Sequence, residues 1–540
     1  MLSTLASDHR RLSSPIATLE METSSPAMSS LRSSSPVPRV RSPMRTLTMF
    51  SRVSSRSLLL PTKRREWLSD LHVFMGLLMS VVGAGMLSVP YTFVTIPTSQ
   101  AVAGIVGVGI SMGCTATALL HAHVQVASKE EQLRYAGAGR RFASFQALSG
   151  KAGGEIFALV VSVVTALGIF GGCVGGIRIV RDLTPHIAEL LLESSSTSSS
   201  DKQQTVEALL LWGSFVVVVL PLCLLKNLSA LKITNYLGFV FSIYLVIAVA
   251  YRSLQALPSG DADSESGSIN VSNLIHLSFN TSLHDEASTV MPFDAEANAG
   301  AVTVATSSSS SDTDADSAPR RAPFLLFAQS ISIYNFAFMM HLNLLPLFVQ
   351  LRGSFDRSMR QARNRMTMGI ASASGFCIAL YLVLGVCGAK LYGKSINGNM
   401  LLNLATDPTM QIPLVALYVI VIVTFPLLFH PMRRILEELL VAKSSTPICF
   451  LRRVMLTVVL LGSALLIAMQ VPGIEVVFSL LGATTCMLIC FIFPVIIFTR
   501  VCPWRQRAWT KLCTLVLWLI VAFEVVIGVA AVYSLSKRKH

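Results

Sequence analysis

The sequence predicts an all-α polytopic membrane protein, and three observations support this class. Hydrophobic residues make up 52% of the 540-residue chain, whereas charged residues make up only 13%, about half the charged fraction of an ordinary soluble domain. The mean hydropathy is +0.62. The charged residues are also clustered, which leaves apolar stretches long enough for the roughly 20 residues that cross a membrane as a helix.

These stretches predict about eleven membrane-spanning helices, each with an apolar run of suitable length. Basic residues concentrate on one side of them, in the N-terminal tail and in alternate short loops, which places the N-terminus in the cytosol. The net charge of +14 therefore reflects orientation in a membrane and not a nucleic-acid partner. The predicted spans are residues 72–95, 101–127, 155–179, 207–225, 233–254, 323–350, 366–392, 411–430, 452–470, 474–500 and 510–535.

Outside the spans, composition divides the chain into a tail and a membrane domain. Residues 1–65 are rich in Ser, Pro and Arg with few carboxylates, which predicts a disordered basic cytosolic tail before a transmembrane domain at 66–540. Within that domain, residues 255–322 form a long acidic loop on the predicted outer side. The sequons at Asn270 and Asn280 make these two residues glycosylation candidates.

The first span carries an interruption at Gly83-Ala84-Gly85, followed by Pro90. Lipid cannot hydrogen-bond freed backbone groups, so a broken helix survives only when protein or a cavity surrounds it. We predict one half-helix ending near Val82 and a second starting near Leu87, with its positive end at the membrane centre. The alternative is that the glycines simply allow close helix packing.

The sixth span, FAQSISIYNFAFMMHLNLLPLF, carries polar residues inside an apolar run but no glycine. Such groups are costly in a membrane unless they face a cavity or each other. Transporters built from inverted repeats place a second interrupted helix at the equivalent point of the second half. Two unusual spans, five apart, therefore favour a secondary transporter with a five-plus-five inverted repeat and interrupted helices 1 and 6.

Four groups of residues resemble the amino acid/auxin permease family, which is related to the amino acid–polyamine–organocation group and has a LeuT-like fold. The similarity covers roughly residues 70–500, with its most specific strings in span 6 and between spans 4 and 5. The matching residues are Gly83-Ala84-Gly85-Met86-Leu87 with Pro90; Phe336-Ala337-Phe338 with His341 and Leu345-Pro346; Pro221-Leu222, Leu224-Leu225-Lys226-Asn227-Leu228 and Leu231-Lys232; and Tyr381, Gly385, Gly388, Tyr392-Gly393 and Asn399.

The resemblance implies an amino acid substrate held at the two interruptions. Its carboxylate would meet backbone amides at Gly83, Ala84 and Gly85, and its ammonium would meet carbonyls freed near Asn335, Phe336, Ala337 and Phe338. Phe336 and Phe338 would close the pocket, although packing in the core is an alternative role. Neither interrupted span has a carboxylate that could pair with a basic side chain of the substrate, and this favours neutral substrates.

The coupling ion depends on residues that depart from the family pattern. In the sodium-coupled branch an Asn lies four residues before the glycine pair, where this chain has Met79, while Thr424 matches a Thr of span 8. A thioether is a poor ligand for a hard cation, so we expect proton coupling or facilitated transport. His341, Thr424 and Glu524 are the coupling candidates. Structural alternatives are a neutral, hydrogen-bonded His341 and a Glu524 paired with a polar neighbour.

Other functional classes find less support. The sequence has no HExxH, G-x-S-x-G, CxxC or P-loop string, so we expect no enzyme activity, cofactor or metal site. A membrane-embedded amino acid sensor and a sodium-coupled symporter remain the alternatives to a proton-coupled or facilitative transporter. The expected partners are a small amino acid, membrane lipid and a proton. We expect the plasma membrane, with a vacuolar or lysosomal membrane as the alternative.

Overall fold

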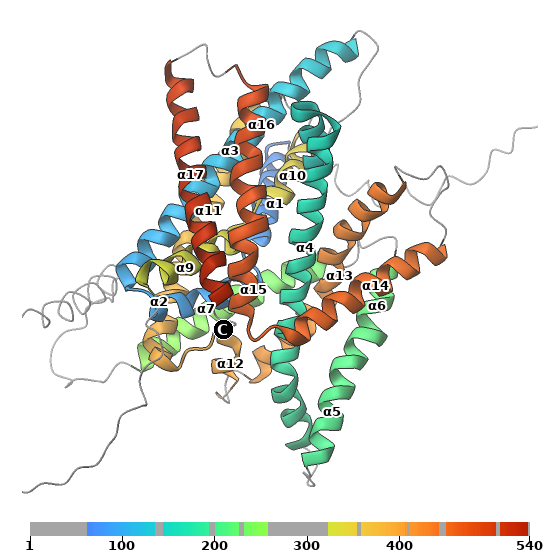
Figure 1. Cartoon of the computed structure of the whole chain (residues 1–540), viewed down its shortest axis with the longest axis vertical. Helices are drawn as coiled ribbons and strands as arrows, with labels where there is room; N and C mark the ends of the chain where they lie inside the picture. The colour runs from blue at the N-terminus through green and yellow to red at the C-terminus, as the bar shows by residue number, and fades with distance from the viewer. Residues whose placement is uncertain are drawn as a thin grey trace, which may run out of the picture. The chain divides into compact units, whose positions relative to one another are not determined.

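The computed structural model describes residues 62–135, 144–193, 200–225, 232–256, 322–353, 358–405, 407, 411–441, 450–503 and 508–537, and within these ranges it is helical with no strand. Asn270, Asn280, most of the acidic loop and nearly all of the N-terminal tail lie outside the described residues. The described helices are α-helices, which Figure 1 labels, and short 3₁₀ or π helices, which are written η. They are α1 (Thr62–Val81), η2 (Ala84–Ser88), α2 (Val89–Thr95), α3 (Thr98–Tyr135), α4 (Phe145–Glu193), α5 (Ser200–Gly213), η3 (Ser214–Val219), α6 (Leu220–Leu224), α7 (Lys232–Gln255), α9 (Pro323–Ala337), α10 (His341–Gly353), α11 (Met359–Tyr392), η5 (Gly393–Ser395), α12 (Met400–Leu404), α13 (Gln411–Val441), α14 (Phe450–Gln470), α15 (Ile474–Leu481), η7 (Gly482–Cys486), η8 (Leu488–Ile492), α16 (Phe493–Val501) and α17 (Ala508–Ser536).

The membrane spans agree with the predicted set. In the described part of the chain ten helical segments are long and apolar enough to cross a membrane, and a bent pair, Asp70–Val81 with Ala84–Thr95, makes up to eleven. The third span is much longer than the predicted 155–179, because it runs from Phe145 to Leu192. It continues past a kink at Gly154, which has a φ of 82° that L side chains rarely adopt.

The predicted break in span 1 is confirmed, with a different local structure. Helix α1 ends at Val81, Gly83 is extended (φ −153°, ψ −153°), and the two halves of the span meet at 44°. Ala84 and Gly85 belong to the 3₁₀ helix η2, whereas a non-helical stretch was expected there. Pro90 lies in the first turn of α2, where its missing N–H costs no helical hydrogen bond.

The predicted break in span 6 is also confirmed, despite the absence of glycine. Helix α9 ends at Ala337 and α10 begins at His341, which leaves Phe338–Met340 between them. The Phe338 N–H donates to the Tyr334 carbonyl at 2.9 Å, and the Met339 N–H donates to the Phe336 carbonyl at 3.3 Å. The last turn thus tightens from i−4 to i−3 bonding before the helix stops.

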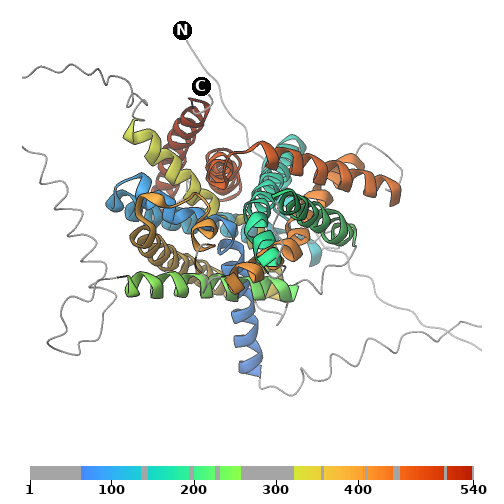
Figure 2. The same ribbon diagram turned by 90° about the horizontal axis from the view of Figure 1, so that it is seen from below.

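The halves of the two broken spans pair with each other. Helix α1 packs against α10, while η2 and α2 pack against α9. Because α1 starts on one side of the membrane and α10 ends there, this pairing is antiparallel, as an inverted repeat requires. Figure 2 shows α1 (blue) leading into the middle of the group of helices. Helix α17, outside the repeat, packs along α9.

Candidate functional site

A cavity of about 640 Å³ lies where the two breaks meet. This volume falls in the ~300–1,000 Å³ range of small-molecule sites. Its walls come from α1 and η2, from the break in span 6 and α10, and from α4, α7 and α13. Glycines 168, 172 and 176 of α4, four residues apart on one helix face, border it and leave space that larger side chains would fill.

The cavity opens towards the side of the membrane on which α1 begins, which is the predicted cytosolic side. His72 near the start of the span and Gln350 near the end of α10 both line the cavity and are exposed. Leu401, from the short helix α12, lines the cavity at the other end and is 1% exposed. The structure is therefore an inward-facing one, given the predicted orientation.

Hydrogen bonds hold the opposite end closed. The Ser88 hydroxyl donates to the Gly398 carbonyl at 2.7 Å, and the Asn399 amide donates to the Asp182 carboxylate at 3.3 Å. Asp182 is also paired with Arg178 at 2.9 Å. These contacts attach the segment before α12 to both span 1 and span 3, so the outer closure depends on side chains from three distant parts of the chain.

The predicted substrate residues divide into two groups. Gly83, Ala84 and Gly85 line the cavity, and so do Phe336 and Ala337. Phe336 is stacked on Phe478 with ring centroids 4.4 Å apart.

Asn335 and Phe338 are buried and are absent from the described lining of the cavity. The Phe338 ring meets Tyr381 edge-on at 4.9 Å, so its contacts are those of a packed core residue. The Asn335 side chain turns instead towards α17.

Tyr381 of α11 connects the two breaks, although the sequence indicated it only as part of a family pattern. Its hydroxyl lies 2.9 Å from the Val81 carbonyl and 3.0 Å from the Ala337 carbonyl. One hydroxyl proton can satisfy one of these acceptors fully, so the other keeps capacity for a further donor. Its partners are 300 and 44 residues away, and no local pattern signals such a contact.

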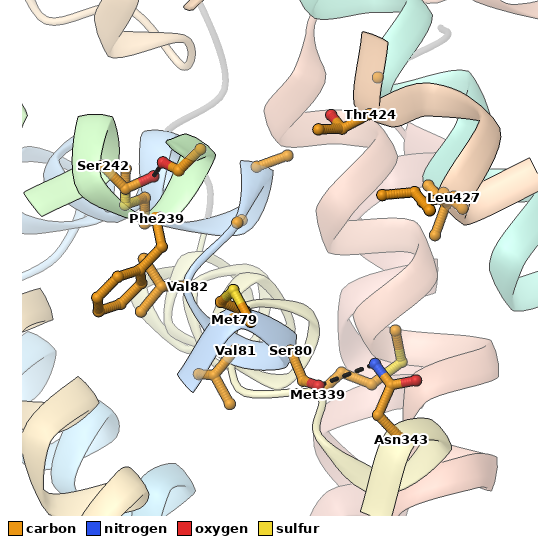
Figure 3. Close-up of a pocket in the computed structure, with 18 of the residues that line it drawn as sticks. Met79, Ser80, Val81, Val82, Phe239, Ser242, Met339, Asn343, Thr424 and Leu427 are labelled. Carbon is orange, nitrogen blue, oxygen red and sulfur yellow. Dashed lines mark hydrogen bonds between the residues drawn. The ribbon is translucent and has the colours of Figure 1, made fainter. Parts of the chain in front are cut away.

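Polar side chains line the cavity, but none of the described lining residues is Asp, Glu, Lys or Arg. Asn343 donates to the Ser80 hydroxyl at 2.8 Å, and Ser80 donates to the Gly76 carbonyl at 3.0 Å. Near the mouth, the Tyr236 hydroxyl lies 2.7 Å from His72 Nδ1. Figure 3 shows the bonded Ser80 and Asn343 near Met79.

The coupling candidates occupy three different environments. Thr424 lines the cavity on α13 (Figure 3), with its hydroxyl donating to Ile420 of its own helix at 2.7 Å. His341 is fully buried, with Nε2 at 3.1 Å from the Thr115 hydroxyl. Glu524 is 2% exposed and accepts a hydrogen bond of 2.6 Å from Asn335. The structure therefore does not bring these three residues together.

The chain is similar to known proteins over most of its length. The family described as transmembrane amino acid transporter protein matches residues 68–537. Sodium-coupled neutral amino acid transporter 4 of Pongo abelii and that of Homo sapiens are each 25% identical over 347 residues, which cover 60% of this chain and 62% of the relative. The matched part of this chain thus spans less than two thirds of the length of these relatives.

A plant relative and a solved structure show more distant similarity. Amino acid transporter AVT6E of Arabidopsis thaliana is 25% identical over 221 residues, 38% of this chain and 43% of the relative. The crystal structure of MhsT in complex with L-phenylalanine superposes with a TM-score of 0.46 and 12% identity, covering 85% of this chain and 98% of that one. Because the family match includes all the spans described above, the chain belongs to the family of transmembrane amino acid transporter proteins.

Proposed function

We propose that this integral, multi-pass membrane protein is a secondary transporter that moves amino acids by alternating access. One observation carries the proposal: the cavity lies where two interrupted spans cross, open at one end and closed by hydrogen bonds at the other. Rocking of one repeat against the other around such a fixed site exchanges the open and closed ends.

The lining chemistry favours a zwitterion with an uncharged side chain. Gly83, Ala84 and Gly85 would offer backbone amides to the substrate carboxylate, and the Ala337 carbonyl, shared with Tyr381, would accept from its ammonium. A charged substrate side chain would find no opposite charge among the described lining residues, and an unpaired charge is costly to bury. The names of the mammalian relatives, which specify neutral amino acids, support the same class.

Sodium coupling is the competing candidate, because those relatives are named as sodium-coupled. One feature of this chain opposes it. Met79 puts a thioether in the cavity wall where the sodium-coupled branch has an Asn, so of the two positions Met79 and Thr424 only the second supplies an oxygen. A hard cation needs several oxygen ligands, so we propose transport without sodium. We also propose the plasma membrane as the site of transport.

The test is uptake of labelled amino acids into proteoliposomes that contain the purified full chain. Substrate-for-substrate exchange across liposomes with no gradient tests transport itself, and imposed sodium or proton gradients test coupling. We expect saturable exchange of neutral amino acids, no stimulation by sodium and loss of exchange in Gly85→Leu. If the protein binds an amino acid but exchanges none, the sensor alternative replaces this proposal.

A further inference from the structure

Glu524 is a buried carboxyl group that the transport site described above does not use. It lies in the middle of α17, is 2% exposed, and has one hydrogen-bond partner among the described residues, the amide Nδ2 of Asn335 at 2.6 Å. No Lys or Arg in the described part of the chain forms an ion pair with it. An isolated carboxylate at membrane depth is expensive and marks a functional group by default.

Among the described residues, the groups around Glu524 supply no positive charge. Helix α17 packs against α3, α9, α15, α16, η7 and η8, and the thiol of Cys490 in η8 is the titratable side chain that interacts with the carboxyl group. Other titratable or charged side chains described on these elements lie near different groups: Tyr334 near Thr92, Cys486 near Met339, Arg500 near Phe157, Glu475 near Gly398 and Gly473, His121 near Thr117, His123 near Phe348 and Cys114 near Cys513.

Asn335 is suited to both protonation states of its partner. Its Nδ2 group donates to the carboxylate, while its Oδ1 atom is buried and has no hydrogen-bond partner in the part of the chain that the structure describes. A half-turn of the amide would bring Oδ1 to the carboxyl group, where a protonated Glu524 could donate to it. The same two side chains can therefore hold a carboxylate or a carboxylic acid without recruiting another residue.

The pair is also connected to the cavity. Asn335 lies two residues before Ala337, which lines the cavity and whose carbonyl accepts from Tyr381. A Cβ atom added to Gly85 would lie 2.7 Å from the Ala337 Cα atom, so the two breaks touch at this point. Reorientation of Asn335 would thus act on the end of α9, where it meets the substrate-binding segment of span 1.

We propose that Glu524 and Asn335 form a proton-binding site that couples proton movement to substrate transport. The inference rests on the proposed function and names its coupling ion. Glu524 takes up one proton from the side of higher proton concentration as the substrate binds and releases it on the other side, so that carboxylate and acid alternate within each transport cycle. Asn335 acts as the positioning residue that passes this change to the break in span 6.

A matched control lies on the same two helices. Gln329 of α9 donates to the Ser534 hydroxyl of α17 at 2.8 Å, a contact between neutral groups. Ser534→Ala removes one hydrogen bond between α9 and α17 without removing a titratable group. Glu524→Gln keeps side-chain volume and a carbonyl, but it cannot exchange a proton. Comparison of the two variants separates proton binding from packing between the helices.

The experiment uses proteoliposomes with a pH-sensitive dye inside, a labelled neutral amino acid outside, and the membrane potential clamped at zero. If one proton accompanies each neutral substrate, a pH difference of one unit drives about tenfold accumulation in wild type and in Ser534→Ala. In Glu524→Gln we expect no accumulation and no dye signal, with substrate-for-substrate exchange still measurable. Proton-driven accumulation that persists in Glu524→Gln would overturn the inference.

The two proposals fail in different ways. Absence of exchange in wild type would refute transport itself, whereas exchange without proton movement in wild type would refute the proton site alone. If Glu524→Gln does not fold, infrared difference spectra of the wild type and Glu524→Asp supply the test. We expect substrate to change a carboxyl C=O band whose position is shifted in Glu524→Asp, and spectra without such a band would contradict the assignment.

Discussion

Gly85 is the position where a single added carbon should separate the two interrupted spans. An ideal Cβ atom at Gly85 would lie 2.7 Å from the Cα atom and 3.0 Å from the Cβ atom of Ala337. Carbon atoms attract best at about 3.5–4.0 Å, so Gly85→Ala requires a displacement of about 1 Å. The obstructing atom is backbone and cannot rotate away, so we expect an overpacking cost of ~1–3 kcal/mol.

Gly83→Ala is the matched control, because a Cβ atom there would meet no atom within 4 Å and the backbone is extended. Thermal unfolding in detergent should give a lower midpoint for Gly85→Ala and a midpoint near wild type for Gly83→Ala. If the displaced break costs ~1.4 kcal/mol in the binding-competent state, exchange at low substrate falls about tenfold. Equal midpoints and equal exchange rates in the two variants would refute the proposed contact between the breaks.

Three further predictions concern the bonds around the cavity. Tyr381→Phe leaves the Val81 and Ala337 carbonyls without their hydroxyl partner, which should destabilise the protein by ~1–3 kcal/mol; an unfolding midpoint equal to wild type would contradict this. Because we propose transport without sodium, uptake should be the same in sodium and choline media, both in wild type and in Thr424→Val, which loses a hydroxyl bonded within its own helix; a sodium dependence that this variant abolishes would show that Thr424 is a sodium ligand and would contradict the proposal. Asn399→Ala breaks the bond to Asp182 at the closed end and the bond that Asn399 accepts from the Leu401 N–H, so deuterium uptake by the amides of Met400–Leu404 should rise, and unchanged deuterium uptake would count against the outer closure.

The number of spans and the first break could be predicted because their causes are local. An apolar run of about 20 residues is needed wherever a helix crosses lipid, and this requirement leaves a direct mark on composition. Gly83 and Pro90 act on their own backbone, through missing side-chain and N–H groups. The predicted half-helices therefore differ from those observed by a few residues, and the main local difference is the 3₁₀ helix η2.

The partners of polar residues could not be predicted, because polarity indicates a need for a partner without identifying one. Asn335 was expected at the substrate site because it lies beside the break, yet its partner is 189 residues away on α17. Tyr381 likewise serves carbonyls on two other spans. These contacts depend on which helices pack together, and that arrangement is set by the whole inverted repeat and not by a local pattern.

The break in span 6 receives contacts from both the substrate side and the proposed proton side. Ala337 faces the cavity and touches Gly85, while Asn335, on the same turn of α9, is bonded to Glu524. If α9 continued past Ala337, a change at either contact would have to move the whole helix. Instead, α9 ends immediately after Ala337. Because a helix end can be displaced without breaking interior hydrogen bonds, substrate and proton can act on the same short segment from opposite sides. Coupling between two ligands requires contacts that differ between two states, and the proposed coupling places that difference at the end of α9.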